Sequence, residues 1–195
     1  MSISFILIAA IIAFLIYAVS VYNSLQSLKT QIAASIQEIG NQLKRQMALI
    51  PNLEKTVKGY LKHEKDIFKS LTDARKKVAT ANETGKSQDV EQAITAVQNL
   101  VPALSVAVED NPEIKADKTV VKFMDELTDT ADKLMYARRS VIDLSQAHNV
   151  KLVTFPSNLV ANLFSFTKEK GLETPNLGEH LSVSEAETKN PEVSL

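Results

Sequence analysis

Cysteine and tryptophan are absent from this chain of 195 residues, and glycine and proline are scarce, at 5 and 6 residues. Without cysteine the chain can form no disulfide, and it offers no thiol nucleophile, no ligand for an iron–sulfur cluster and no thiol for lipidation. So few glycines and prolines leave little room for the turns of an all-β fold. The composition therefore favours one domain of long helices with short appendages.

Sequence motifs of enzyme active sites are missing as well. The three histidines, His63, His148 and His180, lie in different segments, and "HEKDI" lacks the second histidine of a zinc-protease motif. The chain has no glycine-rich phosphate loop and no nucleophile elbow. We therefore predict a protein that is not an enzyme and that needs no cofactor and no metal.

The N-terminal segment lacks charge altogether, because the first charged side chain is Lys29. The run "ISFILIAAIIAFLIYAV" is apolar apart from Ser4, and residues 3–21 as a helix would rise about 28 Å, close to the roughly 30 Å of a bilayer core. A cleaved signal peptide is the alternative, since "AVS" resembles a cleavage site. However, "MSIS" has no positive charge and the helical pattern continues past the cut. We predict that residues 1–21 form a transmembrane anchor in contact with membrane lipids.

Positive charges follow this anchor. Lys29, Lys44 and Arg45 come soon after it, with only Glu38 among them. Because positively charged flanks stay on the cytoplasmic side, the N-terminus is expected outside and the rest of the chain in the cytoplasm.

Apolar residues then recur in steps of three and four along four segments, which is the spacing of amphipathic helices that pack as in a coiled coil. We predict an all-α fold in which the transmembrane helix is followed, over residues 22–152, by an antiparallel four-helix bundle with coiled-coil-like packing. The helices are expected at residues 22–49, 51–83, 88–109 and 117–150. The apolar seam of the first is formed by Tyr22, Leu25, Ile32, Ile36, Ile39, Leu43 and Met47.

Two further segments follow the bundle. Residues 153–170 are expected to form a short amphipathic helix, which would pack on the end of the bundle or lie at a membrane surface. Residues 171–195 are polar, acidic and aperiodic, which is typical of a disordered tail.

Pro51 and Gly85 mark the expected helix boundaries. Proline lacks the amide proton of a helix interior and restricts the residue before it, so "LIPNL" predicts either a tight helix–helix turn at Pro51 and Asn52 or a kink. We favour the turn, since proline suits the first position of a new helix. Gly85 is expected to cap the C-terminus of the second helix.

One carboxylate falls on an apolar seam. Glu64 occupies a core position of the second helix, where a lone charge costs several kcal/mol unless it is paired or close to water. It is a candidate interior polar site that would meet Arg138 or Arg139 of the fourth helix, or else a residue that leans to the helix boundary. His148 ends the fourth seam and is expected at such a boundary too.

The charges are distributed unevenly along the chain. Residues 29–82 hold 11 Lys/Arg and 5 Asp/Glu, whereas residues 83–195 hold 11 and 18. The candidate lipid-facing residues on the basic face of the second helix are Lys55, Lys58, Lys62, Lys65 and Lys69. They would attract anionic headgroups or form an ordinary solvated face. No aromatic side chains interleave with them for base stacking, so nucleic acid is not expected as a partner.

Several of these stretches together resemble the LemA family. The juxtamembrane "YNSLQSLKTQI" is similar to the start of that family, and the most specific match is "QLKRQMALIPNLEKTVKGYLKHE", residues 42–64. Supporting matches are "NPEIKAD" (111–117), "ARRSV" (137–141) and "FPSNLVANLFSF" (155–166). The resemblance covers about residues 1–166 in order. It implies an N-terminal anchor and a cytoplasmic four-helix bundle, and it implies no catalytic activity.

The chain departs from the family pattern in one place. The family usually has a Tyr-Asn pair after "AR" and again one turn later, where this sequence reads "RRSVID" and "SQAHN". We predict a membrane-anchored scaffold or adaptor at a bacterial inner or intracellular membrane, with unknown protein partners. The alternative is a membrane-shaping protein that forms homo-oligomers, including a magnetosome-associated branch of the family.

Overall fold

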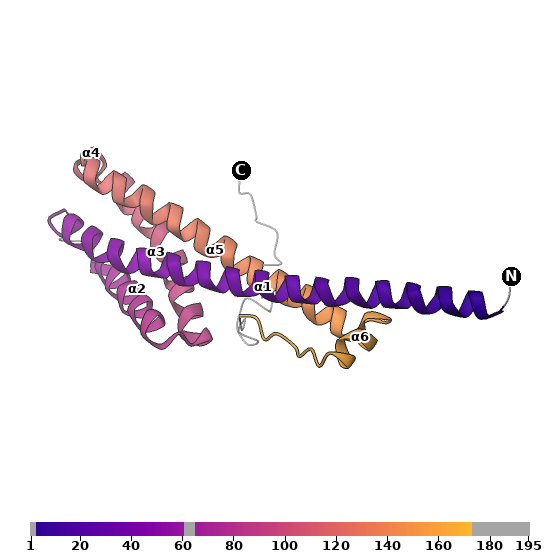
Figure 1. Ribbon diagram of the computed structural model, residues 1–195. Helices are drawn as coiled ribbons and strands as arrows, with labels where there is room; N and C mark the ends of the chain where they lie inside the picture. The colour runs from indigo at the N-terminus through magenta and orange to yellow at the C-terminus, as the bar shows by residue number, and fades with distance from the viewer. Residues whose placement is uncertain (1–2, 61–64, 173–195) are drawn as a thin grey trace, which may run out of the picture.

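The structure is a computed structural model that describes residues 3–60 and 65–172. Every regular element in these two ranges is a helix (Figure 1). The helices are α1 (Ile3–Val57), α2 (Lys65–Thr84), α3 (Ser87–Asp110), α4 (Pro112–Ala116), α5 (Lys118–Val153) and α6 (Ser157–Leu163). The all-α class predicted from the sequence is confirmed for the described part of the chain.

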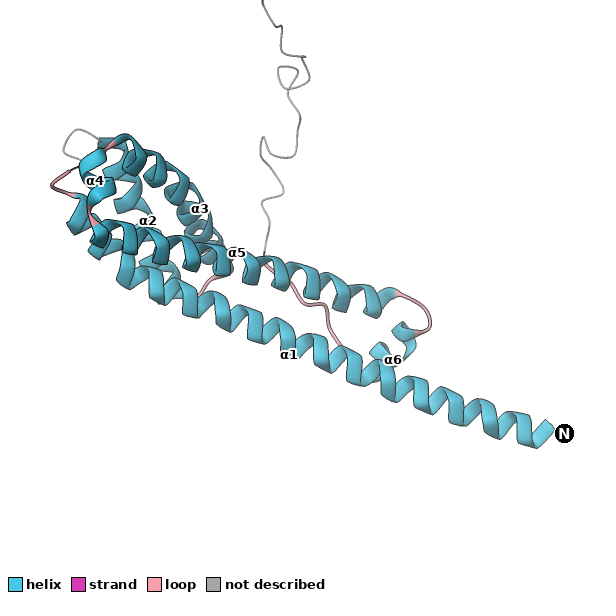
Figure 2. Ribbon diagram, turned by 90° about the horizontal axis from the view of Figure 1, so that it is seen from above, coloured by secondary structure: helices cyan, strands magenta, loops and turns pink. Residues whose placement is uncertain are grey.

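Helix α1 runs the length of the molecule (Figure 2). The predicted turn at Pro51 and Asn52 is wrong, because α1 continues through Pro51 to Val57. A proline inside a helix costs about 3 kcal/mol. Ile50, Leu53 and Val57 around it are all fully buried, and each contributes about 1.5–3 kcal/mol, which more than offsets that cost.

Side chains also support the helix around Pro51. The side-chain amide of Asn52 donates to the carbonyl oxygen of Ala48 at 3.0 Å, and the Thr56 hydroxyl donates to the carbonyl oxygen of Asn52 at 2.8 Å. These bonds hold the Asn52 and Thr56 side chains against carbonyl groups on both sides of the proline.

Helices α2 and α3 form a hairpin whose turn is at Gly85. This residue has a φ of +61°, which suits glycine, and its amide donates to the carbonyl oxygen of Ala81 at 3.0 Å. The predicted C-cap is therefore confirmed. The second helix starts at Lys65 rather than at residue 51, whereas α3 lies within two residues of its predicted bounds.

The main core lies between four helices. Helix α1 packs on α2 and on α5, α2 packs on α3, and α3 packs on α5. Leu71 of α2, Ile94 and Leu104 of α3 and Leu127 of α5 are fully buried in this core. The seams of α2, α3 and α5 supply these residues at the predicted spacing of three and four.

Helix α4 is a single short turn that leads into α5. It arises from "NPEIKAD", where Pro112 takes the first helical position and Ile114 is fully buried. Asp117 then caps α5, since its carboxylate accepts from the amide of Thr119 at 2.8 Å. The start of α5 lies beside the C-terminal end of α1, because the Tyr60 hydroxyl donates to Asp117 at 3.1 Å.

The chain after α5 turns back toward α1 through α6. The helix predicted over residues 153–170 is observed only at Ser157–Leu163, and residues 164–172 continue as a non-helical segment. Leu172 is half-buried against the main core, so the predicted tail boundary at residue 171 falls inside the packed part of the chain. Residues 173–195 of the predicted tail lie outside the described ranges.

Three seam residues differ from the prediction. Ile36 and Met47 of α1 are exposed, whereas His148 of α5, predicted at a boundary, is fully buried. The ring of His148 packs edge-on against Phe166, with centroids 6.2 Å apart. Because Phe166 comes from the segment after α6, the helical pattern of α5 alone gives no sign of this contact.

Candidate functional site

The N-terminal part of α1 has apolar side chains on all sides, and they are exposed. Ile6, Ile12, Phe14 and Ile16 are each at least half exposed, as are most of their large neighbours. By length and composition α1 is the one described helix apolar enough to cross a membrane. It is a candidate anchor, and lipid rather than protein is the solvent that suits such a surface.

A small second core lies where this segment ends. Val21 and Leu25 of α1 pack against Val160 and Ala161 of α6, and all four are buried. The Tyr22 ring packs at a tilt of 59° against Phe164, with the ring centroids 4.8 Å apart. Through these contacts α6 is fixed to the end of the apolar run of α1.

The predicted interior polar site is only partly within the described residues. Glu64 lies outside them, so its pairing with Arg138 or Arg139 stays a prediction. Arg138 is bound by Glu91 of α3, to which both its Nε (2.8 Å) and one terminal nitrogen donate. Arg139 is exposed, and its nearest described acid is Asp143, at 3.6 Å.

The Arg138–Glu91 pair is a half-buried tie between α5 and α3. Its side chains are 20% and 12% exposed, so water screens the pair far less than it screens the exposed pair of Arg139. A partly desolvated ion pair with two hydrogen bonds fixes the register of the two helices. The sequence could have indicated it, because Arg138 is one residue from the buried Ala137 of the α5 seam.

The predicted lipid-facing lysines lie far from the apolar segment. Lys55 is in the last turn of α1, 34 residues after Val21, which corresponds to about 50 Å of helix. Lys58, Lys65 and Lys69 are exposed at the same end, and Lys62 lies outside the described residues. Electrostatic attraction to headgroups falls off within about 8 Å at physiological salt. Contact of this face with the bilayer that holds α1 is therefore not favoured by the geometry.

Tyr60 and Asp117 link the two chain segments at this distal end. The Tyr60 hydroxyl donates a hydrogen bond to the Asp117 carboxylate, and this bond raises the pKa of Tyr60. The backbone amide of Thr119 lowers the pKa of the Asp117 carboxyl, because it stabilises the charged form. The pair thus keeps a charged cap at the start of α5.

Buried amides in α1 were missed by the sequence reading. Gln42 and Gln46 are 5% and 0% exposed. Gln42 donates to Glu38 at 2.5 Å, whereas neither amide atom of Gln46 has a hydrogen-bond partner among the described residues. Gln46 continues the frame of Ile39 and Leu43 toward Ile50 in steps of three and four, so a seam read through Pro51 would have found it.

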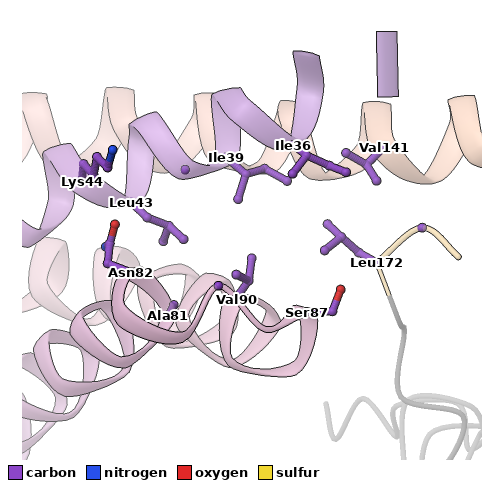
Figure 3. Close-up of a pocket in the computed structure, with 13 residues that line it drawn as sticks. Ile36, Ile39, Leu43, Lys44, Ala81, Asn82, Ser87, Val90, Val141 and Leu172 are labelled. Carbon is purple, nitrogen blue, oxygen red and sulfur yellow. The ribbon is translucent and has the colours of Figure 1, made fainter. Parts of the chain in front are cut away.

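An apolar cavity of about 260 Å³ lies between α1, the α2–α3 turn and the segment after α6 (Figure 3). Ile39 and Leu43 of α1 face Val90 of α3 across it, and Leu172 enters from the side. Lys44 and Asn82 supply polar atoms to its wall. Its size is below the roughly 300–1,000 Å³ of most small-molecule sites, so it suits one or two apolar side chains.

Residues 35–194 match the sequence model of the LemA family, which is most of the chain. The chain belongs to the LemA family. No curated protein matches it at a significant level.

The stretches that resemble the LemA family each have a defined place in the fold. The residues of "NPEIKAD" form α4 and the cap of α5, and those of "FPSNLVANLFSF" form α6 and its flanks. The LemA match begins at residue 35, so the case for the anchor rests on the properties of α1 itself.

Proposed function

We propose that this LemA protein is a membrane-anchored helical scaffold or adaptor at the inner face of a bacterial membrane. The continuity of α1 carries the proposal. The same helix begins as an exposed apolar segment and ends as a buried wall of the main core. A bundle built on the anchor helix itself is held at a fixed distance and angle from the bilayer, which suits a platform for other proteins.

The proposed architecture beyond the anchor is an antiparallel four-helix bundle with coiled-coil-like packing. The cyclic packing order α1, α2, α3, α5 supports it. So does the position of the start of α5 beside Tyr60 at the end of α1. The buried residues of α1, taken in the order Ile39, Leu43, Gln46, Ile50, Leu53 and Val57, follow the alternating steps of a heptad frame.

The proposed orientation places the bundle in the cytoplasm. It is supported by Lys29, Lys44 and Arg45, which lie on the C-terminal side of the apolar segment, because positive charge favours the cytoplasmic side of a membrane.

Membrane shaping by self-association is the second candidate. Its support is the large exposed apolar surface near the anchor, which could join copies as well as meet lipid. The distance of the basic face from the anchor counts against lipid contact by the whole bundle. The adaptor therefore comes first, and we propose no catalytic activity.

The test is to determine what surrounds the protein in its native membrane. Tyr136 on the outer side of α5 is the most exposed aromatic residue of the distal helices, at 76%. A photoreactive residue at this position, with another at Lys69 of α2, would be crosslinked in membranes before mild extraction and mass measurement.

Crosslinks to other proteins in a complex of defined mass are the expected result. A large assembly with crosslinks only between copies would instead support membrane shaping. A monomer that crosslinks to nothing at either position would refute both.

A further inference from the structure

The corner between α5 and α6 combines exposed apolar side chains with an absence of charge. Residues 152–167, "LVTFPSNLVANLFSFT", contain no charged side chain, and Lys151 and Lys168 stand directly on either side. Phe155 is 75% exposed, Leu163 73% and Val153 63%. Water is a poor solvent for so much clustered apolar surface, so a patch of this kind marks a contact site.

The corner lies beside the anchor segment rather than beside the main core. Its inner face, Val160 and Ala161, is buried on Val21 and Leu25 of α1, while Val153, Phe155 and Leu163 on its outer face are exposed. Tyr17 and Ala18, at the end of the apolar run of α1, are half-buried against this inner face. The corner is thus packed directly against the end of the anchor segment.

Three segments, α1, α5 and the chain after α6, have their first charged residues beyond the apolar region close to one another. Lys29 of α1 forms an ion pair with Glu169 at 3.9 Å. Asn149 of α5 exchanges two hydrogen bonds with the backbone of Glu169, at 2.8 and 2.9 Å. Lys151 and Lys168 neighbour these residues in sequence. Three segments far apart in the chain therefore pass from uncharged to charged at the same height on the molecule.

Many backbone groups of the corner are hydrogen-bonded within the corner itself. The amides of Asn158, Phe164, Ser165 and Phe166 all donate to carbonyl groups within the corner, at 2.9–3.1 Å. The Ser157 hydroxyl donates to the carbonyl oxygens of Lys151 and Thr154. Because lipid offers no hydrogen bonds, internal pairing of this kind is what allows a turn to enter it.

We propose that the α5–α6 corner, Leu152–Thr167, inserts into the same leaflet as the cytoplasmic end of the anchor and binds lipid there. The inference rests on the proposed anchor. The exposed polar side chain of Asn162 keeps the corner at the boundary of headgroups and acyl chains, to which interfacial helices typically insert by about 5–10 Å. Lys151 and Lys168 extend to the headgroups from either side. The protein thus holds the bilayer at two points, which fixes the tilt of the bundle.

The chain itself provides a direct test, because it contains no cysteine. Single cysteines are introduced in the full chain at Leu163 and, separately, at Val153, and each carries a polarity-sensitive fluorophore. Ile12→Cys in the anchor is the positive control. Val106→Cys on α3, an aliphatic position with a similar exposure of 58%, is the matched distal control. Each labelled protein is reconstituted in vesicles of phosphatidylethanolamine and phosphatidylglycerol, with and without brominated acyl chains.

We expect blue-shifted emission and quenching by brominated lipid at Leu163→Cys, Val153→Cys and Ile12→Cys, and neither effect at Val106→Cys. Quenching at Ile12→Cys with water-like emission at both corner positions would overturn the corner proposal and leave the anchor intact. Blue-shifted emission at the corner without lipid quenching would mean that protein covers it, and equal quenching at Val106→Cys would mean that contact is unspecific; each overturns the proposal. Absence of quenching at Ile12→Cys would overturn the anchor and the corner together.

Discussion

The two ends of the molecule are both rich in apolar residues, but they expose them differently. At the distal end, α1 presents one buried stripe to α2 and α5, and the rest of its surface is mostly polar and charged, with a few apolar side chains such as Ile36 and Met47. At the anchor end, the same helix is apolar on every side and almost nothing covers it. The small core of Val21, Leu25, Val160 and Ala161 lies where one pattern gives way to the other.

The difference indicates two solvents along one helix. In water, a helix with one apolar stripe can bury that stripe in a core while its polar face remains hydrated. A helix without a polar face is stable only when it is buried in protein or in lipid. The described protein does not cover this part of α1, which leaves lipid as the proposed environment.

The largest expected effect concerns the distal core. Leu104→Ala should lower the free energy of unfolding by about 2–5 kcal/mol, since Leu104 is fully buried and its loss leaves a cavity. Urea unfolding of the full chain in detergent, followed by circular dichroism, measures it. Val106→Ala on the exposed side of α3 is the control and should change stability by no more than about 0.5 kcal/mol. Equal losses of stability in the two variants would contradict a core that buries only one side of α3.

A charge in the anchor should act on insertion rather than on folding. Ile12→Asp places a carboxylate in the middle of the apolar run, which makes the free energy of membrane insertion less favourable by about 2.5–3.5 kcal/mol. We expect a reduced membrane-bound fraction in cells, measured after alkaline extraction. Val106→Asp, at an equally exposed aliphatic residue, should remain fully membrane-bound. If both variants stay bound, the two ends do not differ in solvent as we propose.

Loss of the half-buried ion pair should have the next largest effect. Glu91→Gln removes the charge that binds Arg138 and should lower the free energy of unfolding by about 1.5–3 kcal/mol, the usual contribution of hydrogen bonds to a charged group. Asp143→Asn, beside the exposed Arg139, is the matched control and should cost less than about 0.5 kcal/mol. Thermal unfolding of both variants decides whether the α3–α5 tie stabilises the fold.

Gln46 offers a change in the opposite direction. Its buried amide has no hydrogen-bond partner among the described residues, so Gln46→Leu should raise the free energy of unfolding by about 1–2 kcal/mol. Gln31→Leu on the exposed side of α1 is the control and should have little effect. A loss of stability in the buried variant would show that the amide is hydrogen-bonded in solution.

The smallest effect is the pH dependence of the α5 cap. Because the pKa of Asp117 is lowered in the folded chain, its charge adds stability above the unfolded value of about 3.9. That stability disappears as the pH falls through the folded value. Asp117→Asn keeps a good cap but does not titrate. Its unfolding curves should therefore approach those of the unaltered chain as the pH is lowered through this range; a constant difference would rule out the cap as the source.

Much of the fold could be predicted because helical periodicity is a local property. The seams of α2, α3 and α5 and the cap at Gly85 were all readable from the spacing of apolar residues and one glycine. The error at Pro51 came from giving local backbone preference more weight than burial. The heptad frame from Ile39 through Gln46 to Val57 in fact runs unbroken across the proline.

The candidate site was less accessible to sequence reasoning. Arg138 was singled out, but its described partner is Glu91 of α3, 47 positions earlier in the chain. His148 was placed at a boundary because nothing in α5 shows that Phe166 covers it. Partners of this kind come from other helices, and their identity depends on how those helices are rotated and aligned.

The sequence by itself determined that the chain is helical, where most of its core faces lie, and that its first helix is apolar enough to enter a membrane. These properties depend on residues within one or two turns of each other. Only the tertiary structure decided that α1 passes through Pro51, that α6 lies against the end of the apolar run, and that charge begins at one level on three segments. Those outcomes depend on the burial that distant segments give one another, which outweighs local preference when several large side chains are buried together.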